Sequence, residues 1–323
     1  MVLSNEQLLT TLTGAAEITE ENGKLAPYRF GKHVRENVYP EGNRFHPATM
    51  QTSGIVSRFL TDSEAVAFSY AVSTLSAGQS FDVWADGVFY ATQCCDPTEG
   101  RVEVKLPKGE KLITIYFPHH EDGRIFDVTL DNGASFACAP ARKHKILFIG
   151  DSITHGSTAA HASMTYAHQI SRMLDAEVVN QGIGGEGFCP EAVDNGLCFT
   201  PDLVSVAYGT NDWSHAPSYE EMKERAEGHL LALRAKYPNA KMAMILPIWR
   251  ADHTLLKPTG TFEETHALLR ELAARVDATA IDGRLLVPHV TDVFADARLH
   301  PSEFGFQFYA ENLLPHFKKI LEQ

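Results

Sequence analysis

Up to about Pro140, apolar and polar residues alternate in short runs that turn signals interrupt. Four stretches show this period of two: 54–73, 80–93, 101–118 and 124–135. Asp-Gly, Pro-Lys-Gly and Asn-Gly sequences interrupt the runs, and these residues favour tight turns between strands. Regularly spaced strands without intervening helices predict an all-β sandwich. The first 45 residues are less clear, with a short helix expected around Glu6–Leu12.

After the short basic segment 139–144 the pattern changes. Apolar runs suited to buried parallel strands begin at Lys145, Ala176, Asp202, Lys241 and Ala278. Amphipathic stretches separate several of them, and two open with the spacing of a capping box, Ser218 with Glu221 and Thr261 with Glu264. Strands that alternate with helices predict a three-layer α/β/α domain, whose chemistry gathers at the carboxyl ends of the strands.

Four polar blocks lie where strands of this second half are expected to end, or just before the last helix. They are "GDSI" at 150–153, "NQGIGGEG" at 180–187, "GTND" at 209–212 and "DARLHPSEFG" at 296–305. Because parallel strands present their carboxyl ends at one edge of the sheet, the blocks are expected to lie near one another.

Each block supplies a group that acyl transfer needs. The Ser152 hydroxyl is a weak nucleophile until a base takes its proton, and His300 is a suitable base. Asp296, four residues before the histidine, would fix its tautomer and stabilise the imidazolium. Backbone N–H groups of Ser152 and Gly185, with the Asn211 side-chain amide, would bind the oxyanion of the tetrahedral intermediate.

In this order, the blocks resemble those of the SGNH hydrolases, also called the GDSL lipase/esterase superfamily. The family pattern has serine in G-D-S-[LI], glycine in N-x-G-x-x-G, asparagine in G-x-N-D and histidine in D-x-x-H-P. Ser152, Gly185, Asn211 and His300 occupy these positions. The resemblance implies a serine esterase that uses a Ser-His pair. Because no metal-ligand spacing appears in the sequence, we expect neither a metal nor a cofactor.

One position departs from the family pattern. The aspartate is expected three residues before the histidine, and that position holds Ala297, with Asp296 one residue earlier. We expect the loop to absorb the extra residue and keep Asp296 as the acid that orients His300. Asp292 or a backbone carbonyl are the alternatives.

The N-terminal strands resemble the jelly-roll modules that precede the catalytic domain in some SGNH carbohydrate esterases. The stretch "ITIYFP", followed by "FDVTLDNGA", carries this resemblance. The domains are therefore expected at 1–142, the sandwich, and at 143–323, the hydrolase domain. The resemblance implies that carbohydrate esters, acetylated ones first, are the substrates.

Structural explanations compete with several of these functional ones. Ser152 alone would cap the next helix, and Asn211 with Asp212 would form a turn; the four blocks together favour chemistry over these readings. Four aromatic residues near the blocks serve equally well as substrate-pocket walls or as core: Phe188, Tyr208, Trp213 and Trp249. No phosphate-loop or zinc-site spacing is present, and the pair His119–His120 is expected at an exposed strand end.

The formal net charge of −13 argues against a nucleic-acid or an anionic-membrane partner. No apolar stretch has the length of a signal peptide core or a membrane helix, and the five cysteines lack pairing or metal-site spacing. These features predict a cytoplasmic protein with reduced thiols; a homo-oligomer remains open.

The sequence therefore predicts a serine esterase that removes short acyl groups, acetyl first, from carbohydrates or small alcohols. An acyltransferase that uses the same Ser-His site is the first alternative, because both reactions share the acyl-enzyme. A carbohydrate-binding protein with an inactive hydrolase fold is the second, and only the displaced aspartate supports it. Long-chain lipase activity is disfavoured, since no apolar lid is evident.

Overall fold

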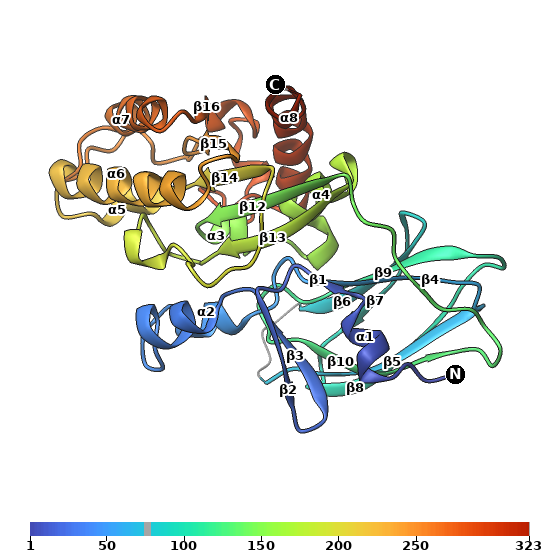
Figure 1. Cartoon of the computed structure of the whole chain (residues 1–323). Helices are drawn as coiled ribbons and strands as arrows, with labels where there is room; N and C mark the ends of the chain where they lie inside the picture. Colours follow the sequence, from blue (N-terminus) through green and yellow to red (C-terminus); the bar gives the residue numbers. More distant parts are fainter. Residues whose placement is uncertain (74–78, 323) are drawn as a thin grey trace.

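A computed structural model describes residues 1–73 and 79–322 of the chain. An antiparallel β region forms one half of the molecule and a layered α/β region the other, and the N- and C-termini lie in different halves (Figure 1). Both halves match the architecture that the hydrophobic pattern predicts. The domain boundary at 142/143 stays a prediction, although β12 begins just after it, at His144.

Two antiparallel sheets form the β region. The larger has the order β1-β4-β9-β6-β7, with β11 paired to β4, and the smaller has the order β10-β5-β8. The strands are β1 (Leu12–Thr13), β4 (Val56–Thr61), β5 (Ala65–Ala71), β6 (Ser80–Ala85), β7 (Val88–Cys94), β8 (Glu99–Lys105), β9 (Lys111–Tyr116), β10 (Arg124–Leu130) and β11 (Ala137–Cys138). Alternate residues of both sheets, such as Ile113 and Ile115 on β9 and Phe68 on β5, are buried in one core between them. The sequence-predicted sandwich is therefore confirmed.

The outer face of the larger sheet packs against the α/β region. Tyr116, which follows Ile115 and so points to the opposite face of β9, lies 4.8 Å from the ring of His168 between ring centroids. The guanidinium of Arg172 lies over the ring of Trp84. The two regions thus share an interface in which aromatic side chains of the sheet pack against His168 and Arg172, on a sheet face that would otherwise meet water.

Five parallel strands form the sheet of the α/β region, in the order β13-β12-β14-β15-β16. They are β12 (His144–Gly150), β13 (Ala176–Gly182), β14 (Leu203–Ala207), β15 (Lys241–Ile245) and β16 (Thr279–Ile281). The helices are α3 (Ser152–His155), α4 (Tyr166–Leu174), α5 (Thr210–His215), α6 (Tyr219–Lys236), α7 (Phe262–Arg275) and α8 (Glu303–Leu321). Short helical turns lie at η2 (Ala162–Met164), η3 (Pro190–Ala192), η4 (Gly283–Leu285) and η5 (Thr291–Val293).

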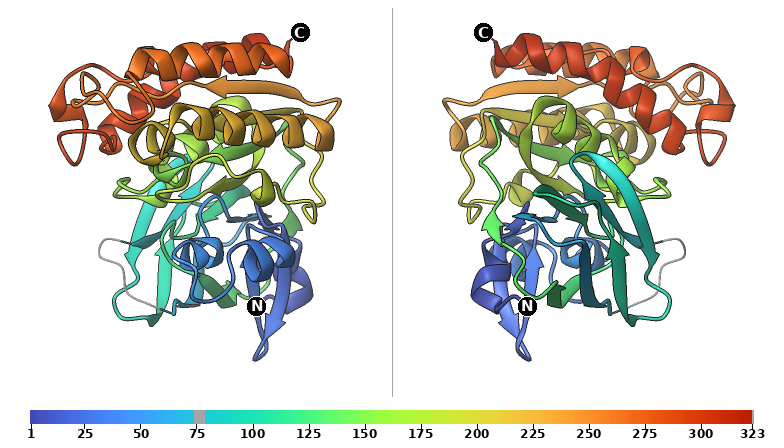
Figure 2. Two further views of the ribbon diagram at one scale, coloured as in Figure 1. Left: turned by 90° about the vertical axis from the view of Figure 1, so that its left-hand side faces the viewer. Right: turned by 90° about the vertical axis from the view of Figure 1, so that its right-hand side faces the viewer.

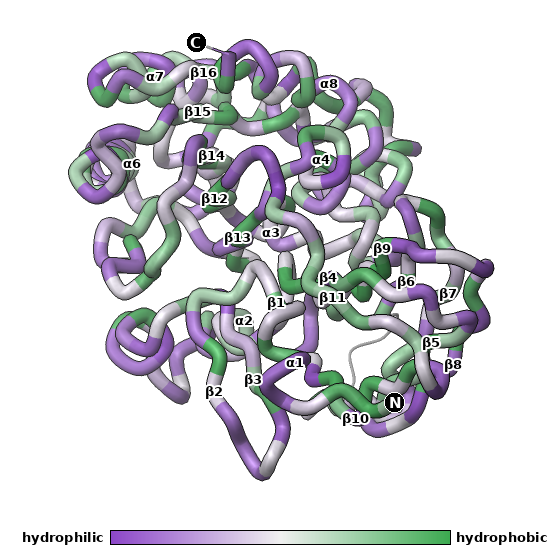
Figure 3. The backbone as a smooth tube through the Cα atoms, turned by 45° about the vertical axis from the view of Figure 1, so that its right-hand side comes forward, coloured by the Kyte–Doolittle hydropathy of each residue, from purple (hydrophilic) through white to green (hydrophobic). Residues whose placement is uncertain are grey.

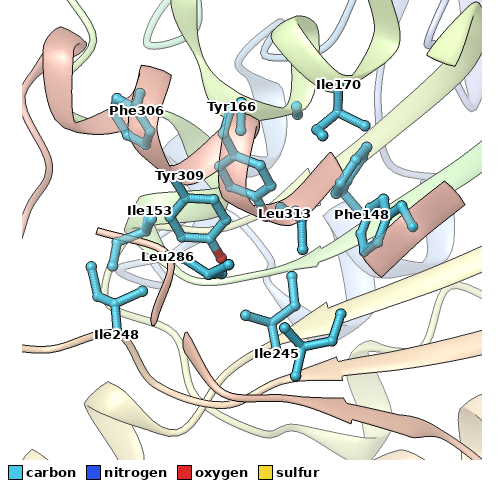
Figure 4. Packing of buried hydrophobic residues seen from close by; sticks show 14 of the residues in the cluster. Phe148, Ile153, Tyr166, Ile170, Ile245, Ile248, Leu286, Phe306, Tyr309 and Leu313 are labelled. Atoms are coloured by element: carbon cyan, nitrogen blue, oxygen red, sulfur yellow. The ribbon is translucent and has the colours of Figure 1, made fainter. Parts of the chain in front are cut away.

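Helices cover both faces of this sheet (Figure 2). On β12, Ile146 and Phe148 face the core that α4 and α8 close, whereas Leu147 and Ile149 face the core that α6 and α7 close. Figure 4 shows the first core, where Phe148 and aromatic residues of α4 and α8 come together. Because both faces are buried, the strands consist of continuous apolar runs, as the sequence predicts.

The predicted helix starts are present, with one difference. Thr261 and Glu264 form the full reciprocal capping box at the start of α7. At α6, Ser218 accepts the N–H of Glu221 at 3.1 Å, but the Glu221 side chain instead lies 3.7 Å from Arg225. The cap on α6 is therefore made by the serine alone.

The N-terminal segment, residues 1–50, includes the 45 residues that the sequence left unclear. It contains α1 (Asn5–Leu9), which ends three residues earlier than expected, the hairpin β2 (Glu17–Glu21) and β3 (Lys24–Tyr28), the π-helical turn η1 (Val34–Val38) and α2 (His46–Met50). The tip of the hairpin is hydrophilic and projects from the molecule (Figure 3). After β3 the chain returns to the α/β region, beginning with Arg29.

Arg29 fastens this segment to the edge of the parallel sheet. Its side chain is fully buried, and its Nη1 donates to the carbonyl oxygens of Asn180 at 2.8 Å and Gly182 at 2.6 Å. These two alternate residues of β13 present their carbonyl groups on the side away from β12. The guanidinium therefore closes an edge that carries unpaired acceptors.

The pair His119–His120 was expected at an exposed strand end, but the structure does not expose it. His119 is 2 % exposed, and the His120 ring packs at a tilt against the His155 ring of the α/β region, with 4.5 Å between ring centroids. Burial lowers the pKa of His120 to about 4, since a charged imidazole loses its hydration there. The strand end points into the contact between the two regions, which the local sequence does not reveal.

Candidate active site

Ser152 is the first residue after the turn that follows β12. Asp151 is the helix cap, because its Oδ1 accepts the N–H of Ile153 at 2.9 Å. Ser152 is thus the first residue of α3 rather than its cap. Its N–H is one of those that a helix start leaves without an intrahelical partner, and its hydroxyl is free for other bonds.

His300 connects the Ser152 hydroxyl to a carboxylate. Its Nε2 lies 2.9 Å from Ser152 Oγ, and its Nδ1 lies 2.8 Å from Asp296 Oδ2. An ionised carboxylate only accepts hydrogen bonds, so Nδ1 carries the proton and Nε2 is left to accept from the serine. The three side chains have the arrangement that activates a serine hydroxyl.

Asp296 is held as a carboxylate by the turn in which it lies. Its Oδ1 accepts the backbone N–H groups of Arg298 at 3.0 Å, Leu299 at 2.8 Å and His300 at 3.0 Å. Partial burial on its own would raise the pKa of Asp296. The hydrogen bonds, that from Leu299 first, outweigh it and hold the pKa well below its usual range.

The residue that is extra relative to the family pattern is absorbed at Ala297. Ala297 has φ of +55°, in the left-handed region, and the chain on either side closes in a bridge between Phe294 and Pro301. The N–H of Ala295 also bonds the carbonyl of His300 at 2.8 Å. Asp292, the alternative acid, is exposed and has no contact with His300. The turn therefore presents Asp296 to the imidazole.

The glycine-rich block lies directly beside Ser152. A Cβ added at Gly182 would come within 2.4 Å of the backbone nitrogen of His155, so only glycine allows β13 to approach α3 this closely. A Cβ added at Gly184 would lie 3.9 Å from Ser152 Cβ. Gly185 has φ of +79°, a conformation that favours glycine.

Asn211 joins the third block to the second. It is the second residue of α5, and its Nδ2 donates to the carbonyl of Glu186 at 2.8 Å. Among the described residues that amide makes no other hydrogen bond, so its second N–H is available. Asp212 supports the same junction by accepting the N–H groups of Phe188 at 2.9 Å and Gly209 at 3.1 Å.

A pocket of about 390 Å³ opens beside these donors. Gly185 and Asn211 line it, and so do Tyr39 and Phe45 from the N-terminal segment. The ring of Phe45 would be 3.8 Å from a Cβ on Gly185. The wall of the pocket is therefore shared between the two halves of the chain. Its volume falls in the lower part of the range of small-molecule sites.

Residues 148–308 match the model of the GDSL-like Lipase/Acylhydrolase family. The α/β half of this chain belongs to that family. No sequence among the curated proteins matches the chain.

Several solved structures share the whole architecture. A salicylyl-acyltransferase from a tetracycline biosynthetic pathway is 22% identical, with a TM-score of 0.81 over 96% of this chain and 94% of the other. A protein from Bacteroides ovatus described as a GDSL-like lipase is 19% identical, with a TM-score of 0.80 over 100% and 98%. A family two carbohydrate esterase from Cellvibrio japonicus is 17% identical, with a TM-score of 0.69 over 100% and 97%. At these identities the likeness establishes the fold, a β-sandwich before an SGNH domain.

Glu186 is a site residue to which the sequence analysis gave no role, although it lies in the second block, directly after the family pattern ends at Gly185. Its buried carboxylate accepts hydrogen bonds from Tyr208 at 2.5 Å and from Tyr39 of the N-terminal segment. Burial raises the pKa of Glu186 to about 7, and the two tyrosine hydrogen bonds offset only part of that rise. An acid between two glycines was the available signal, whereas Tyr39 lies 147 residues away and gave none.

The four aromatic residues divide between the two alternatives left open by the sequence. Tyr208 and Trp213 lie in the core, and the Trp213 ring N–H donates to the carbonyl of Gly260. Phe188 is buried but contributes to the pocket lining. Trp249 is half-buried and packs on Phe294, beside the turn that carries Asp296 and His300. Pocket roles thus remain predictions for Phe188 and Trp249 alone.

Within residues 1–73 and 79–322, no cluster of three or more His, Cys, Asp or Glu side chains is arranged to hold a metal ion. All five cysteines are free of disulfide bonds. None of the described helices combines the length and hydropathy that crossing a bilayer requires.

Proposed function

We propose that the protein is a serine esterase that hydrolyses short acyl esters, acetyl esters first, of carbohydrates or small alcohols through an acyl-enzyme. The observation that carries the proposal is the continuous hydrogen-bonded chain from Ser152 Oγ through His300 to Asp296. The family match over residues 148–308 and the carbohydrate esterases among the solved structures support it.

In this mechanism Ser152 Oγ attacks the ester carbonyl while His300 Nε2 takes its proton. The oxyanion receives the N–H groups of Ser152 and Gly185 and the second amide N–H of Asn211. His300 then gives its proton to the departing alcohol, which leaves the acyl group on Ser152 Oγ. Water repeats the sequence, with His300 again as base, and releases the acid and the free serine.

Replacement of the nucleophile tests the proposal. Ser152→Ala should lower kcat on p-nitrophenyl acetate by about 10⁴-fold or more, because no other group takes over its attack. Ser4→Ala, in the exposed cap of α1, is the matched control and should keep full activity. The wild type, but not Ser152→Ala, should be labelled by a fluorophosphonate serine probe. Full activity in Ser152→Ala would contradict the proposal, and an unlabelled, inactive wild type would favour a non-catalytic binding protein.

An acyltransferase shares every step up to the acyl-enzyme. Product analysis with a competing alcohol distinguishes the two, since a transferase yields the new ester even when water is in large excess. Comparing acetyl with octanoyl esters tests chain length in the same assay.

A further inference from the structure

The pocket beside Gly185 and Asn211 carries two guanidinium groups on separate elements. Arg44 lies between η1 and α2 of the N-terminal segment, and Arg225 lies on α6 of the α/β region. The whole chain has a net charge of −13, so two cations at one small pocket run against its overall balance. Two guanidinium groups at one pocket attract ligands of negative charge.

The acids of the pocket wall bond mainly to groups other than these arginines, although burial raises the pKa of Asp212 and the charge of Arg225 works against that rise. The carboxylate of Glu186 is bonded to Tyr39 and Tyr208, and that of Asp212 accepts two backbone N–H groups. Burial raises the pKa of both acids, that of Glu186 to about 7. The hydrogen-bonding capacity of both carboxyl groups is therefore used largely inside the wall of the pocket.

Neither arginine makes a strong ion pair with another side chain in the described part of the chain. Within the described part of the chain, no carboxylate lies within ion-pair distance of Arg44, whose guanidinium rests over the Phe45 ring at 4.4 Å. Arg225 lies 3.7 Å from Glu221, and both side chains are about half exposed, so this pair contributes little. Phe45, whose ring would lie 3.8 Å from a Cβ on Gly185, places Arg44 on the wall of the same pocket as Gly185 and Asn211.

We propose that Arg44 and Arg225 select an anionic substrate, an ester of an acidic sugar whose carboxylate binds in this pocket while its acyl group meets Ser152. Arginine suits this task because its planar fork matches a carboxylate. Phosphate shares this chemistry, and the arms of the experiment separate the two. The inference rests on the proposed esterase function and adds the substrate class to it.

The test compares kcat/KM for three acetylated methyl glucosides that differ only at carbon 6: a carboxylate, a hydroxymethyl group and a phosphate ester. The wild type should prefer the carboxylate over the neutral sugar by about tenfold or more, the range of a charge-assisted contact. Arg44→Ala and Arg225→Ala should each lower that ratio severalfold, and the double variant should bring it to about one. Taking the ratio within each variant removes any effect of folding or of nucleophile strength.

Arg270→Ala is the matched control, because Arg270 is an equally exposed helical arginine on α7 outside the pocket. It should keep the wild-type ratio. Arg44→Lys should keep part of the preference, since it retains the charge and loses the fork. A ratio near one in the wild type, or a ratio that the double variant leaves intact, would overturn the inference. A stronger preference for the phosphate would replace the carboxylate with that group.

Two further measurements separate this inference from the proposed function. Hydrolysis of p-nitrophenyl acetate by the wild type reports the esterase function without a charged substrate. Calorimetric titration of Ser152→Ala with methyl glucuronoside and with methyl glucoside reports the pocket without chemistry. Hydrolysis without selective glucuronoside binding would retain the function and reject the anionic substrate. Selective binding without hydrolysis would retain the anionic ligand and reject the esterase function.

Discussion

Two sides of the candidate active site are supported differently. Ser152, Asp296 and His300 are positioned by short-range contacts within the α/β region, a helix cap on one side and a closed turn on the other, and α3 also contacts the N-terminal half through His155. The loop that carries Gly185 and Glu186 is held by the N-terminal segment as well. Arg29 bonds to Gly182 at the base of the loop, and Tyr39 bonds to the Glu186 carboxyl group. We infer that changes in the N-terminal half affect the oxyanion side more directly than the nucleophile side, because Arg29 and Tyr39 bond to the glycine-rich block itself.

The largest expected effect lies on the nucleophile side. Asp296→Asn should lower kcat on p-nitrophenyl acetate by about 10⁴-fold, the order found when the orienting acid of a Ser-His-Asp triad is made neutral and the wrong imidazole tautomer is held. Asp292→Asn should retain activity, since its side chain has no contact with His300. Equal losses in both variants would mean that the turn at Ala297 does not select Asp296.

A smaller effect is expected on the oxyanion side. Asn211→Ala removes one donor and should lower kcat by 10²- to 10³-fold, or about 3 kcal/mol of transition-state stabilisation. Labelling by the fluorophosphonate probe should be slowed as well, because the phosphonyl oxygen occupies the same donors. An unchanged kcat would exclude Asn211 from the oxyanion site. Asn239→Ala, at an exposed position before β15, is the control.

Glu186, which bonds to Tyr39 of the N-terminal segment, is expected to make the free energy of unfolding depend on pH. The folded-state pKa of Glu186 is raised from its ordinary value of 4.5 to about 7, so between these values the folded protein holds a proton that the unfolded chain has lost. Glu186 therefore contributes stability below pH 4.5 that is lost as the pH rises through 7, on the order of 3 kcal/mol in total.

Glu186→Gln, which stays neutral, should remove this contribution. Urea unfolding at pH 5 and pH 7.5 should show a smaller loss with rising pH in the variant than in the wild type. The difference between the two proteins is the relevant quantity, because Asp151 changes stability in the same direction and the buried histidines in the opposite one. Glu224→Gln, at an exposed position of α6, should match the wild type, and an identical pH dependence in Glu186→Gln would contradict the assignment.

The smallest effect is expected at the inserted residue. The left-handed conformation of Ala297 costs conformational free energy. Because Ala297 is exposed, a glycine there loses no packing. Ala297→Gly should raise the free energy of unfolding by up to about 1 kcal/mol and keep kcat within about twofold. Ala297→Val should lower both, since a branched side chain resists this conformation further. Thermal unfolding and p-nitrophenyl acetate hydrolysis measure the two quantities.

The parts that were predictable from the sequence share a local cause. Strands buried on both faces need continuous apolar runs, and for this reason β13 was predicted at its observed bounds, 176–182. The four site blocks lie at strand ends and helix starts, where their geometry depends on a few neighbouring residues. Ser152 and His300 could therefore be placed together although 148 residues separate them.

The parts that were missed depend on distant contacts, with one exception. Tyr39 and Arg29 have roles only because β13 and Glu186 lie next to them, and His119 is buried only because the other region covers it. The β2–β3 hairpin, by contrast, had a local signal. Asn22-Gly23 is the favoured two-residue turn, and both residues have positive φ.

Arg29 also bears on what happens when the two halves are separated. A chain that began at residue 143 would keep the parallel sheet but lose the guanidinium that occupies the outer side of β13. That strand would then offer free acceptors to any neighbouring strand, the condition under which sheets join edge to edge and precipitate. By covering this edge of the sheet, Arg29 of the N-terminal half disfavours self-association through β13.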